Sequence, residues 1–242
     1  MTPRYEFKIP CASALLPEIE AWVRLHPAHW RVSYPPRQVN NIYFDSFDLQ
    51  SLNANLGSVE ERQKLRLRWY GTDLAQVTAA QLELKCRQGV ASWKETAPFG
   101  RAPFGRPPFD GVLLLEQLPW SALMATLRQG LDARAQHWLA CYAQPTLINS
   151  YQRAYYETPD GELRLTLDTR LRAYAQRYMA YPNLRQQAVQ PDVMIVELKS
   201  PTGDAAVRRL TALLASFPAR VGRFSKYLHG MLAATDFEGV FA

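Results

Sequence analysis

Apolar and polar residues alternate with a period of two in seven segments of the chain. In order, these are residues 5–9, 41–44, 64–70, 81–86, 150–156, 163–168 and 194–199. Successive side chains of a strand point to opposite faces, so this alternation predicts half-buried β-strands. The sequence Thr158-Pro159-Asp160-Gly161 is typical of a turn and lies between two of these segments. It predicts a hairpin that runs from Ser150 to Asp168.

Helical patterns lie between these runs of strands. The apolar residues recur at helical spacing within residues 14–25, 47–56, 111–129, 131–142 and 204–217. In the last segment, one face would carry Val207, Leu210, Leu213, Leu214 and Phe217. Strands come in runs, with helices inserted between the runs. This order predicts an α+β fold with a mostly antiparallel sheet rather than regular βαβ winding.

One stretch of the chain is rich in Pro and Gly. Residues 97–111 contain APFGR twice in succession and then PPFDG. Because strands of similar pattern lie on both sides, we interpret the stretch as a surface loop, with Arg101 and Arg106 solvated, rather than as a linker. The sequence therefore predicts a single domain over residues 1–242.

Composition narrows the class of protein. Hydrophobic residues make up 48% and charged residues 21% of the chain, as in ordinary globular proteins. The net charge of +6 favours an anionic partner. Three cysteines without CxxC spacing indicate reduced thiols and a cytoplasmic location. Apolar runs are far shorter than the ~18 residues of a membrane span, and the four histidines lack the spacing of a zinc site.

Basic residues project from one face of several predicted strands. Lys64, Arg66 and Arg68 would lie about 7 Å apart on one face. Taken alone, such a row is explained by a solvated face. Other strands repeat the pattern with carboxylates mixed in: Arg4, Glu6, Lys8; Gln81, Glu83, Lys85; Tyr151, Arg153, Tyr155; Arg164, Thr166, Asp168; and Glu197, Lys199. If the sheet closed on itself, this face would form a charged inner wall.

Such a wall suits a chain of phosphates and a divalent metal. Arg binds phosphate oxygens bidentately, and Lys supplies a compact charge. Carboxylates among the cations are ligands that Mg²⁺ or Mn²⁺ prefers. Glu197 is the first candidate ligand, with a salt bridge to Lys199 or to an Arg as the alternative. For Glu83 metal ligation and an ion pair are equally good interpretations, and Asp168 is better explained by a structural role.

Seven motifs follow one another in a fixed order: NIYFDS (41–46), LRLRWYG (65–71), LELK (82–85) with WKE (93–95), SYQR (150–153), LRLTLDT (163–169), VELK (196–199) and RFSKYLHG (223–230). Together they resemble the VTC (vacuolar transporter chaperone) domain, the catalytic domain of polyphosphate polymerases in the CYTH-like triphosphate tunnel superfamily. The resemblance implies an antiparallel β tunnel, a closed barrel of about eight strands with flanking helices. It also implies an ATP:polyphosphate phosphotransferase that uses Mn²⁺ or Mg²⁺ and extends inorganic polyphosphate.

The charged rows and the resemblance together assign the site. The residues expected to act in catalysis are Arg66, Arg68, Lys85, Arg153 and Lys226. Those expected to bind phosphate are Lys8, Lys64, Lys94, Tyr151, Arg164, Lys199, Arg223 and Ser225. The metal ligands would be Glu197 and Glu83.

The chain departs from the family at two positions. Asn55 stands where the family commonly has an Arg that contacts phosphate. Here that contact is either missing or supplied by Arg62 or Lys64. Arg223 stands where some members have Lys, which keeps the charge and changes its geometry.

Two other functions compete with this interpretation. A metal-dependent triphosphatase of the same superfamily would usually begin with ExExK, whereas Arg4-Tyr5-Glu6-Phe7-Lys8 has a cation in place of one carboxylate. Nucleic acid is not expected as a partner, because only Tyr151 and Tyr155 interleave with a basic residue on a strand face. Export of the product would require a membrane partner protein, since no span is found.

Overall fold

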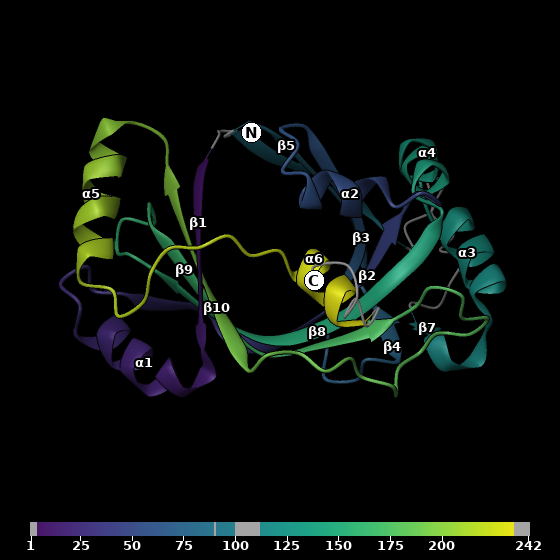
Figure 1. Cartoon of the computed structure of the whole chain (residues 1–242), viewed down its shortest axis with the longest axis horizontal. Coiled ribbons are helices and arrows are strands. Elements are labelled where there is room, and N and C mark those ends of the chain that lie inside the picture. Colours follow the sequence, from purple (N-terminus) through teal and green to yellow (C-terminus); the bar gives the residue numbers. More distant parts are fainter. Residues whose placement is uncertain (1–3, 90, 100–111, 235–242) are drawn as a thin grey trace, which may run out of the picture. The chain divides into compact units, whose positions relative to one another are not determined.

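The computed structural model describes residues 4–89, 91–99 and 112–234 (Figure 1). Eight strands form one sheet in the order β1-β10-β9-β8-β2-β3-β5-β6, and every pairing with a described register is antiparallel. The strands are β1 (Arg4–Ala12), β2 (Arg31–Asp45), β3 (Arg62–Tyr70), β5 (Gln81–Gln88), β6 (Ala91–Pro98), β8 (Gln144–Glu157), β9 (Arg164–Ala175) and β10 (Val193–Pro201). The predicted α+β class with an antiparallel sheet is confirmed.

The helices are α1 (Leu16–Leu25), α2 (Gln50–Leu56), α3 (Trp120–Gln129), α4 (Ala133–Cys141), α5 (Asp204–Ala215) and α6 (Lys226–Ala234). Short 3₁₀ turns, η1 (Ser13–Leu15) and η2 (Leu115–Gln117), add to them. None of the helices in the described part of the chain is long and apolar enough to cross a membrane. The three cysteines, Cys11, Cys86 and Cys141, have free thiols.

The chain divides into two compact units. Unit 1 comprises Met1–Arg37, Tyr151–Leu171 and Pro191–Ser225, and unit 2 comprises Gln38–Ser150, Arg172–Gln190 and Lys226–Ala242. Each unit is therefore assembled from three separate stretches of the sequence. Three of the boundaries fall within the strands β2, β8 and β9.

In unit 1, α1 and α5 cover one face of the strands β1, β10 and β9 (Figure 1). The predicted apolar face of α5 buries Leu210 and Leu213, whereas Val207 is 44% exposed. These helices pack on the odd-numbered residues of β1 and β9 and the even-numbered residues of β10, such as Ile9, Leu165 and Val196. The alternation of the strands therefore directs their charged residues to the opposite face.

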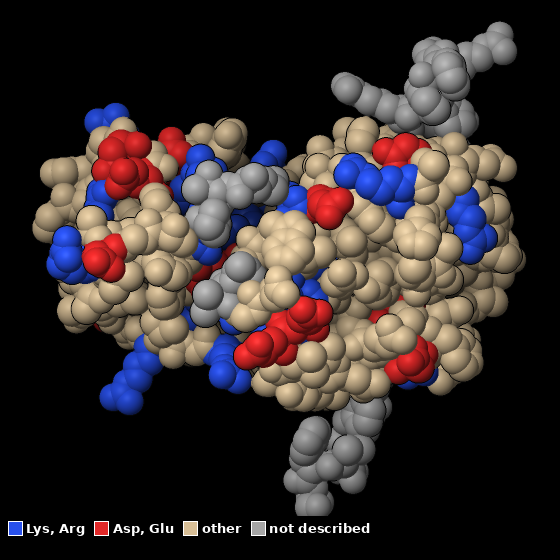
Figure 2. All heavy atoms as spheres, turned by 90° about the horizontal axis from the view of Figure 1, so that it is seen from above, with Lys and Arg blue, Asp and Glu red and all other residues tan. Residues whose placement is uncertain are grey.

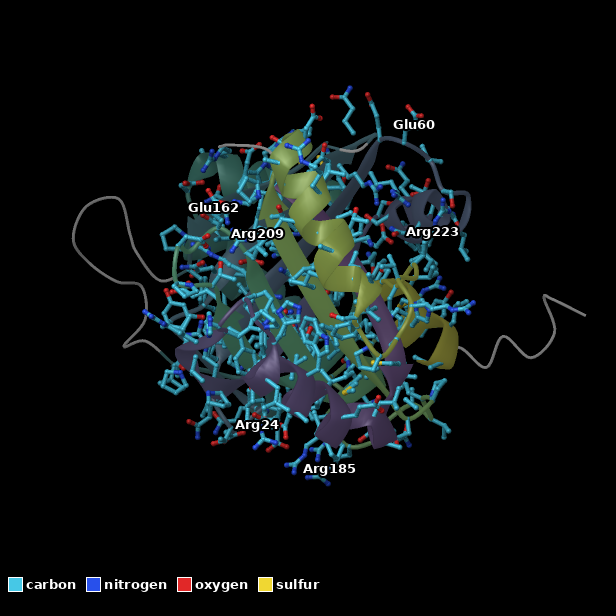
Figure 3. All side chains as sticks on the ribbon, turned by 90° about the vertical axis from the view of Figure 1, so that its left-hand side faces the viewer. Arg24, Glu60, Glu162, Arg185, Arg209 and Arg223 are labelled. Atoms are coloured by element: carbon cyan, nitrogen blue, oxygen red, sulfur yellow. The ribbon has the colours of Figure 1, made fainter. Side chains whose placement is uncertain are left out.

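A salt bridge joins α5 to the hairpin of unit 1. Nη1 of Arg209 lies 2.6 Å from Oδ2 of Asp160 and 3.3 Å from Oε2 of Glu162. Figure 3 shows Arg209 and Glu162 side by side. The hairpin turn itself closes where the N–H of Thr158 donates to the carbonyl of Leu163 at 3.0 Å. The predicted hairpin is confirmed, with strands longer than the alternation indicated.

In unit 2, α3 and α4 cover one face of β2, β3 and β5, and α6 packs on the other (Figure 1). Leu65, Leu67 and Trp69 are fully buried beneath α3 and α4. The face under α6 includes Tyr43, which pairs with Arg66 in register. Helix α6 therefore lies on the face that carries the basic residues of β3.

Several predicted boundaries were wrong. Residues 112–114 form strand β7 (Val112–Leu114), which pairs with β4 (Gln76–Thr78), and the helix begins only at Trp120. Such three-residue strands are too short to show a period in the sequence. Strand β2 begins ten residues before its alternating part, across Pro35 and Pro36, which interrupt the pattern. Most of the expected loop, including Arg101 and Arg106, lies outside the described residues.

Candidate functional site

Net charge does not locate a site in this protein. On the face seen in Figure 2, basic and acidic side chains are interspersed. Charged side chains that are close enough to bind one ligand lie instead on the sheet faces opposite α1 and α5 in unit 1 and opposite α3 and α4 in unit 2. Each unit has one such group, and we describe them separately.

In unit 1, acidic and basic side chains from four strands form what we call the Glu197 cluster. Its members are Glu6 and Lys8 on β1, Arg153 on β8, Asp168 on β9, and Glu197 and Lys199 on β10. The strand register places Lys8 opposite Glu197 and Glu6 opposite Lys199. The pairing of strands thus places Lys8, Glu197 and Lys199 on adjacent strands, while their roles in a site stay a prediction.

Glu197 is the centre of this cluster. Its Oε1 lies 2.7 Å from Nζ of Lys199, and its Oε2 lies 3.9 Å from Nη2 of Arg153. Glu6 approaches the same ammonium of Lys199 at 4.0 Å. Glu197 raises the pKa of Lys199, against the opposing effect of burial. Glu197 therefore forms the salt bridge to Lys199 that was one of its two predicted roles. Its other predicted role, metal ligation, stays a prediction.

Arg153 is fixed by a second carboxylate. Its Nη2 donates to Oδ2 of Asp168 at 2.7 Å, and its Nε donates to Oδ1 of the same group. Asp168 is fully buried. Burial alone would lower the pKa of Arg153, but Asp168 outweighs it and raises that pKa well above the ordinary value. A bidentate pair of this kind holds the guanidinium in one orientation, which agrees with a structural role for Asp168.

The remaining basic residues of unit 1 surround this cluster. Arg164 lies opposite Lys199 in the register. Nζ of Lys8 donates to the carbonyl of Phe224 at 3.2 Å, and the N–H of Gly222 donates to the carbonyl of Lys8. These contacts bring the stretch that contains Arg223 and Ser225 to β1. Tyr151 is buried beneath the guanidinium of Arg153, whose central carbon is 5.3 Å from the ring centre.

In unit 2, Glu83 is surrounded by three cations, which we call the Glu83 cluster. Its Oε2 lies 2.7 Å from Nη2 of Arg66 and 3.8 Å from Nη1 of Arg68, and its Oε1 lies 2.7 Å from Nζ of Lys94. Burial alone would raise the pKa of this carboxyl, but the three cations lower it strongly. Glu83 therefore forms the ion pairs that were one of its two predicted roles. Its ligation of a metal stays a prediction.

Three lysines form a row across the same sheet face. Lys64 lies opposite Lys85 on the neighbouring strand, and Lys85 lies opposite Lys94 on the next. We call this the lysine row. Like charges placed directly opposite in a sheet are destabilising. Glu83 supplies a counter-charge to Lys94, and a bound polyanion would add negative charge along the whole row, so the row is the strongest indication of what unit 2 binds.

Asparagines that the sequence analysis did not single out hold Arg68 in place. Nε of Arg68 donates to Oδ1 of Asn41 at 2.9 Å, and Nδ2 of Asn41 donates to Oδ1 of Asn149 at 2.8 Å. Both asparagines are buried. A buried amide needs a partner, so an Asn within an apolar strand is the signal that could have revealed them.

A second buried group connects α2 and α6 to β2. Asp45 accepts hydrogen bonds from the N–H groups of Ser51 and Leu52, at 2.9 and 3.0 Å, and from the hydroxyl of Tyr227. The ring of Tyr227 stacks on Tyr43, whose hydroxyl accepts from Nη1 of Arg66. Lys226 is the first residue of the same helix. This network fixes where α6 begins on the charged face.

Asn55 and the two cations that could replace the family's Arg lie on α2 and β3. Asn55 donates from Nδ2 to the carbonyl of Ser51 in its own helix at 2.6 Å. Arg62 and Lys64 lie on the same face of β3 as Arg66, and their replacement of the family's Arg stays a prediction. Among the described residues, no group of three or more His, Cys, Asp or Glu is arranged to hold a metal ion.

Comparison with protein families identifies the class of protein. The sequence model of the VTC domain family matches residues 3–235. The chain therefore belongs to the VTC domain family. No protein of curated function matches the chain.

Three solved structures are similar to the chain over most of its length. A proposed adenylate cyclase from Vibrio parahaemolyticus has 12% identity and a TM-score of 0.45, with 93% of this chain and 95% of that chain covered. A proposed adenylyl cyclase from Hippeastrum, described as having a dominant triphosphatase activity, has 16% identity, a TM-score of 0.49 and coverages of 94% and 93%. A protein from Pyrococcus horikoshii has 11% identity, a TM-score of 0.46 and coverages of 95% and 98%. Such distant similarity carries no functional assignment.

Proposed function

We propose that this protein is a metal-dependent polyphosphate polymerase, which transfers the γ-phosphoryl group of ATP to the end of an inorganic polyphosphate chain. The observation that carries the proposal is the lysine row, in which Lys64, Lys85 and Lys94 lie opposite one another. Membership of the VTC family supports it. We also propose that the reaction takes place in the cytoplasm, where ATP is available, and that any export of product depends on a membrane partner.

The charge balance of unit 2 suits a polyanion. Glu83 is the acidic member of a cluster with Arg66, Arg68 and Lys94, so positive charge is in excess there. Each bridging phosphate carries about one negative charge, and guanidinium and ammonium groups bind its oxygens without needing base-specific contacts. The lysine row and the two arginines would therefore hold consecutive phosphates.

The Glu197 cluster suits a divalent metal bound together with substrate phosphates. Mg²⁺ is usually held by one or two carboxylates, with the remaining ligands supplied by phosphates and water. Glu197 and Glu6 provide oxygen donors near Lys199, so the donor set fits Mg²⁺ or Mn²⁺. When bound, the metal would neutralise charge that develops on the transferred phosphoryl group.

The protein's own residues have little covalent work to do in this reaction. A terminal oxygen of the polyphosphate chain attacks the γ-phosphorus, the bond to the β–γ bridging oxygen breaks, and ADP leaves with the electron pair. Catalysis of this kind rests on positioning and on charge stabilisation. Arg153, held by Asp168, and Lys199 would orient the triphosphate and stabilise its charge.

A triphosphatase is the second candidate, and the proximity of Glu6 to Glu197 is the observation that favours it. Both carboxylates contact Lys199, and two metal ions that activate water need several such ligands. Against it, the first position of the β1 face is Arg4, and Asp168 is engaged by Arg153. The cationic excess of unit 2 favours retention of a long chain over release of a short one.

The deciding experiment incubates the purified chain with ATP and Mn²⁺ and measures ADP, orthophosphate and acid-insoluble polyphosphate separately. The proposal expects ADP to match the phosphate recovered in polymer. Orthophosphate without polymer would refute polymerase activity and support the triphosphatase. Displacement of bound polyphosphate by single-stranded RNA at equal charge concentration would instead indicate a nucleic-acid-binding protein.

A further inference from the structure

We propose that Tyr34 and Arg37, supported by Tyr155, bind the nucleobase of the ATP whose phosphates occupy the Glu197 cluster. We call these three residues the tyrosine platform. All three belong to unit 1. The inference rests on the proposed function for the presence of ATP, but it concerns a part of the nucleotide that neither charged cluster can recognise.

The platform is a layered contact of aromatic rings and a guanidinium group. The central carbon of Arg37 lies 5.6 Å from the ring centre of Tyr34 and 5.0 Å from that of Tyr155. The two rings meet edge to face at 5.7 Å. Nε of Arg37 also donates to the hydroxyl of Tyr155 at 3.1 Å, which fixes the plane of the guanidinium. Aromatic rings and guanidinium planes are the groups on which proteins stack nucleobases.

The local sequence holds this arrangement ready for a ligand. Tyr34 and Arg37 are separated by Pro35 and Pro36, whose rings fix φ near −65°. Restricting the backbone of the unfolded chain in this way lowers the entropy cost of fixing the segment that carries the two side chains. The platform is therefore positioned before any base arrives.

Fold stability does not account for the exposed ring of Tyr34. Tyr34 is 57% exposed, and the apolar core of unit 1 lies on the other face of the sheet, beneath α1 and α5. Contacts between a cation and an exposed ring contribute only ~0.5–1 kcal/mol. The outer surface of Tyr34 is thus an accessible, flat, apolar area in an otherwise charged region.

Arg153 places the platform beside the phosphate-binding groups. Its central carbon lies 5.9 Å from the ring centre of Tyr155, and its Nη2 lies 3.9 Å from Oε2 of Glu197. Tyr151, Arg153 and Tyr155 share one face of β8, because alternate residues of a strand point the same way. One side chain therefore contacts both the platform and the cluster, as a ligand with a base at one end and phosphates at the other requires.

The test compares ATP with inorganic triphosphate, which has the phosphates but no base. Binding of both to the full chain is measured by titration calorimetry with Mg²⁺, for the wild type, Tyr34→Ala and Tyr34→Phe. Tyr181→Ala serves as the control, since Tyr181 is 58% exposed but lies in unit 2. Loss of one stacking contact should weaken ATP binding about 5- to 150-fold.

The expected result is that Tyr34→Ala weakens ATP binding but not triphosphate binding, that Tyr34→Phe restores ATP binding, and that the control changes neither. Equal loss for both ligands, or unchanged ATP binding in Tyr34→Ala, would overturn the platform while leaving the phosphate site intact. If the wild type bound neither ligand, the proposed function would fail and the platform with it.

Discussion

The hydroxyl of Tyr227 donates a hydrogen bond of 2.6 Å to Oδ2 of Asp45, a residue that also accepts from the first turn of α2. Both side chains are buried. Burial and the neighbouring carboxylate raise the pKa of Tyr227, so the phenol stays protonated and keeps donating. One carboxylate therefore fixes two helices on β2.

Replacing Tyr227 by Phe should destabilise the protein by ~1–3 kcal/mol, because a buried carboxylate loses a donor that water cannot replace. Chemical denaturation measures the change in the free energy of unfolding. Tyr181→Phe, at a 58% exposed position, is the control and should change it by less than ~0.5 kcal/mol. Equal stability of the two variants would show that the hydrogen bond to Asp45 contributes nothing net.

Two Arg–Asp pairs of unit 1 provide a matched comparison of burial. Asp168→Asn breaks a pair in which Asp168 is fully buried and Arg153 is 11% exposed. It should cost ~3–5 kcal/mol, because Glu197, at 3.9 Å, is a more distant counter-charge for the guanidinium. Asp160→Asn breaks a pair with Arg209 in which the two side chains are 46% and 36% exposed, and should cost at most ~1 kcal/mol. Thermal unfolding of both variants checks this order. A reversed order would contradict the structural role assigned to Asp168.

Removing the middle lysine of the lysine row should weaken the binding of polyphosphate. Lys85→Gln takes away one of three cations that lie opposite one another on β3, β5 and β6. Its affinity for polyphosphate should fall, and the salt dependence of binding should become shallower. Arg24→Gln, an exposed change on α1, is the control for net charge. Unchanged polyphosphate affinity in Lys85→Gln would remove the main support for the proposed function.

Glu197→Gln should abolish turnover while the protein remains folded. The amide keeps the shape of the side chain but loses the charge that a divalent metal requires. Polyphosphate production from ATP is measured with Mn²⁺, together with the circular dichroism spectrum and the unfolding midpoint. Glu18→Gln, an exposed change on α1, should keep full activity. Normal turnover of the Glu197 variant would exclude this residue as the metal ligand.

The Glu83 cluster predicts a loss of stability in acid. The pKa of Glu83 is lowered in the folded protein from an ordinary value of 4.5. A lowered pKa contributes stability that is present above pH 4.5 and is lost as the pH falls towards the folded pKa. Glu83→Gln removes this contribution, so the difference in unfolding free energy between wild type and variant should shrink from pH 7 to about pH 3. A difference that stays constant with pH would show that Glu83 is not held ionised by Arg66 and Lys94.

The sequence predicted which face of a strand each side chain occupies better than which residues lie opposite it on the adjacent strands. Alternation alone placed Lys64, Arg66 and Arg68 on one face and Leu65, Leu67 and Trp69 on the other, and the burial of the apolar side chains agrees. The lysine row could not be predicted in this way, because it depends on the register between β3, β5 and β6. Register is set by how neighbouring strands pair across the sheet, and the pattern of a single strand carries no information about that pairing.

Contacts between distant residues were missed for a related reason. Asp45 and Tyr227 are both inside recognised motifs, yet neither motif indicates that one bonds to the other across 182 positions. The N-terminal part of β2 was missed because Pro35 and Pro36 break the alternation there. The same interruption concealed Tyr34 and Arg37 as a functional pair.

The pairing of β1 with β10 has a consequence for how the protein is made. Arg4 pairs with Pro201, and Ala12 pairs with Val193, so β1 has no partner until the residues of β10 have also been synthesised. Translation at ~5–20 residues per second leaves that strand waiting for tens of seconds. Contacts so distant in sequence also slow folding itself. Nascent chains should therefore depend on chaperones that shield Ile9 and Cys11, the two side chains of β1 that end up buried.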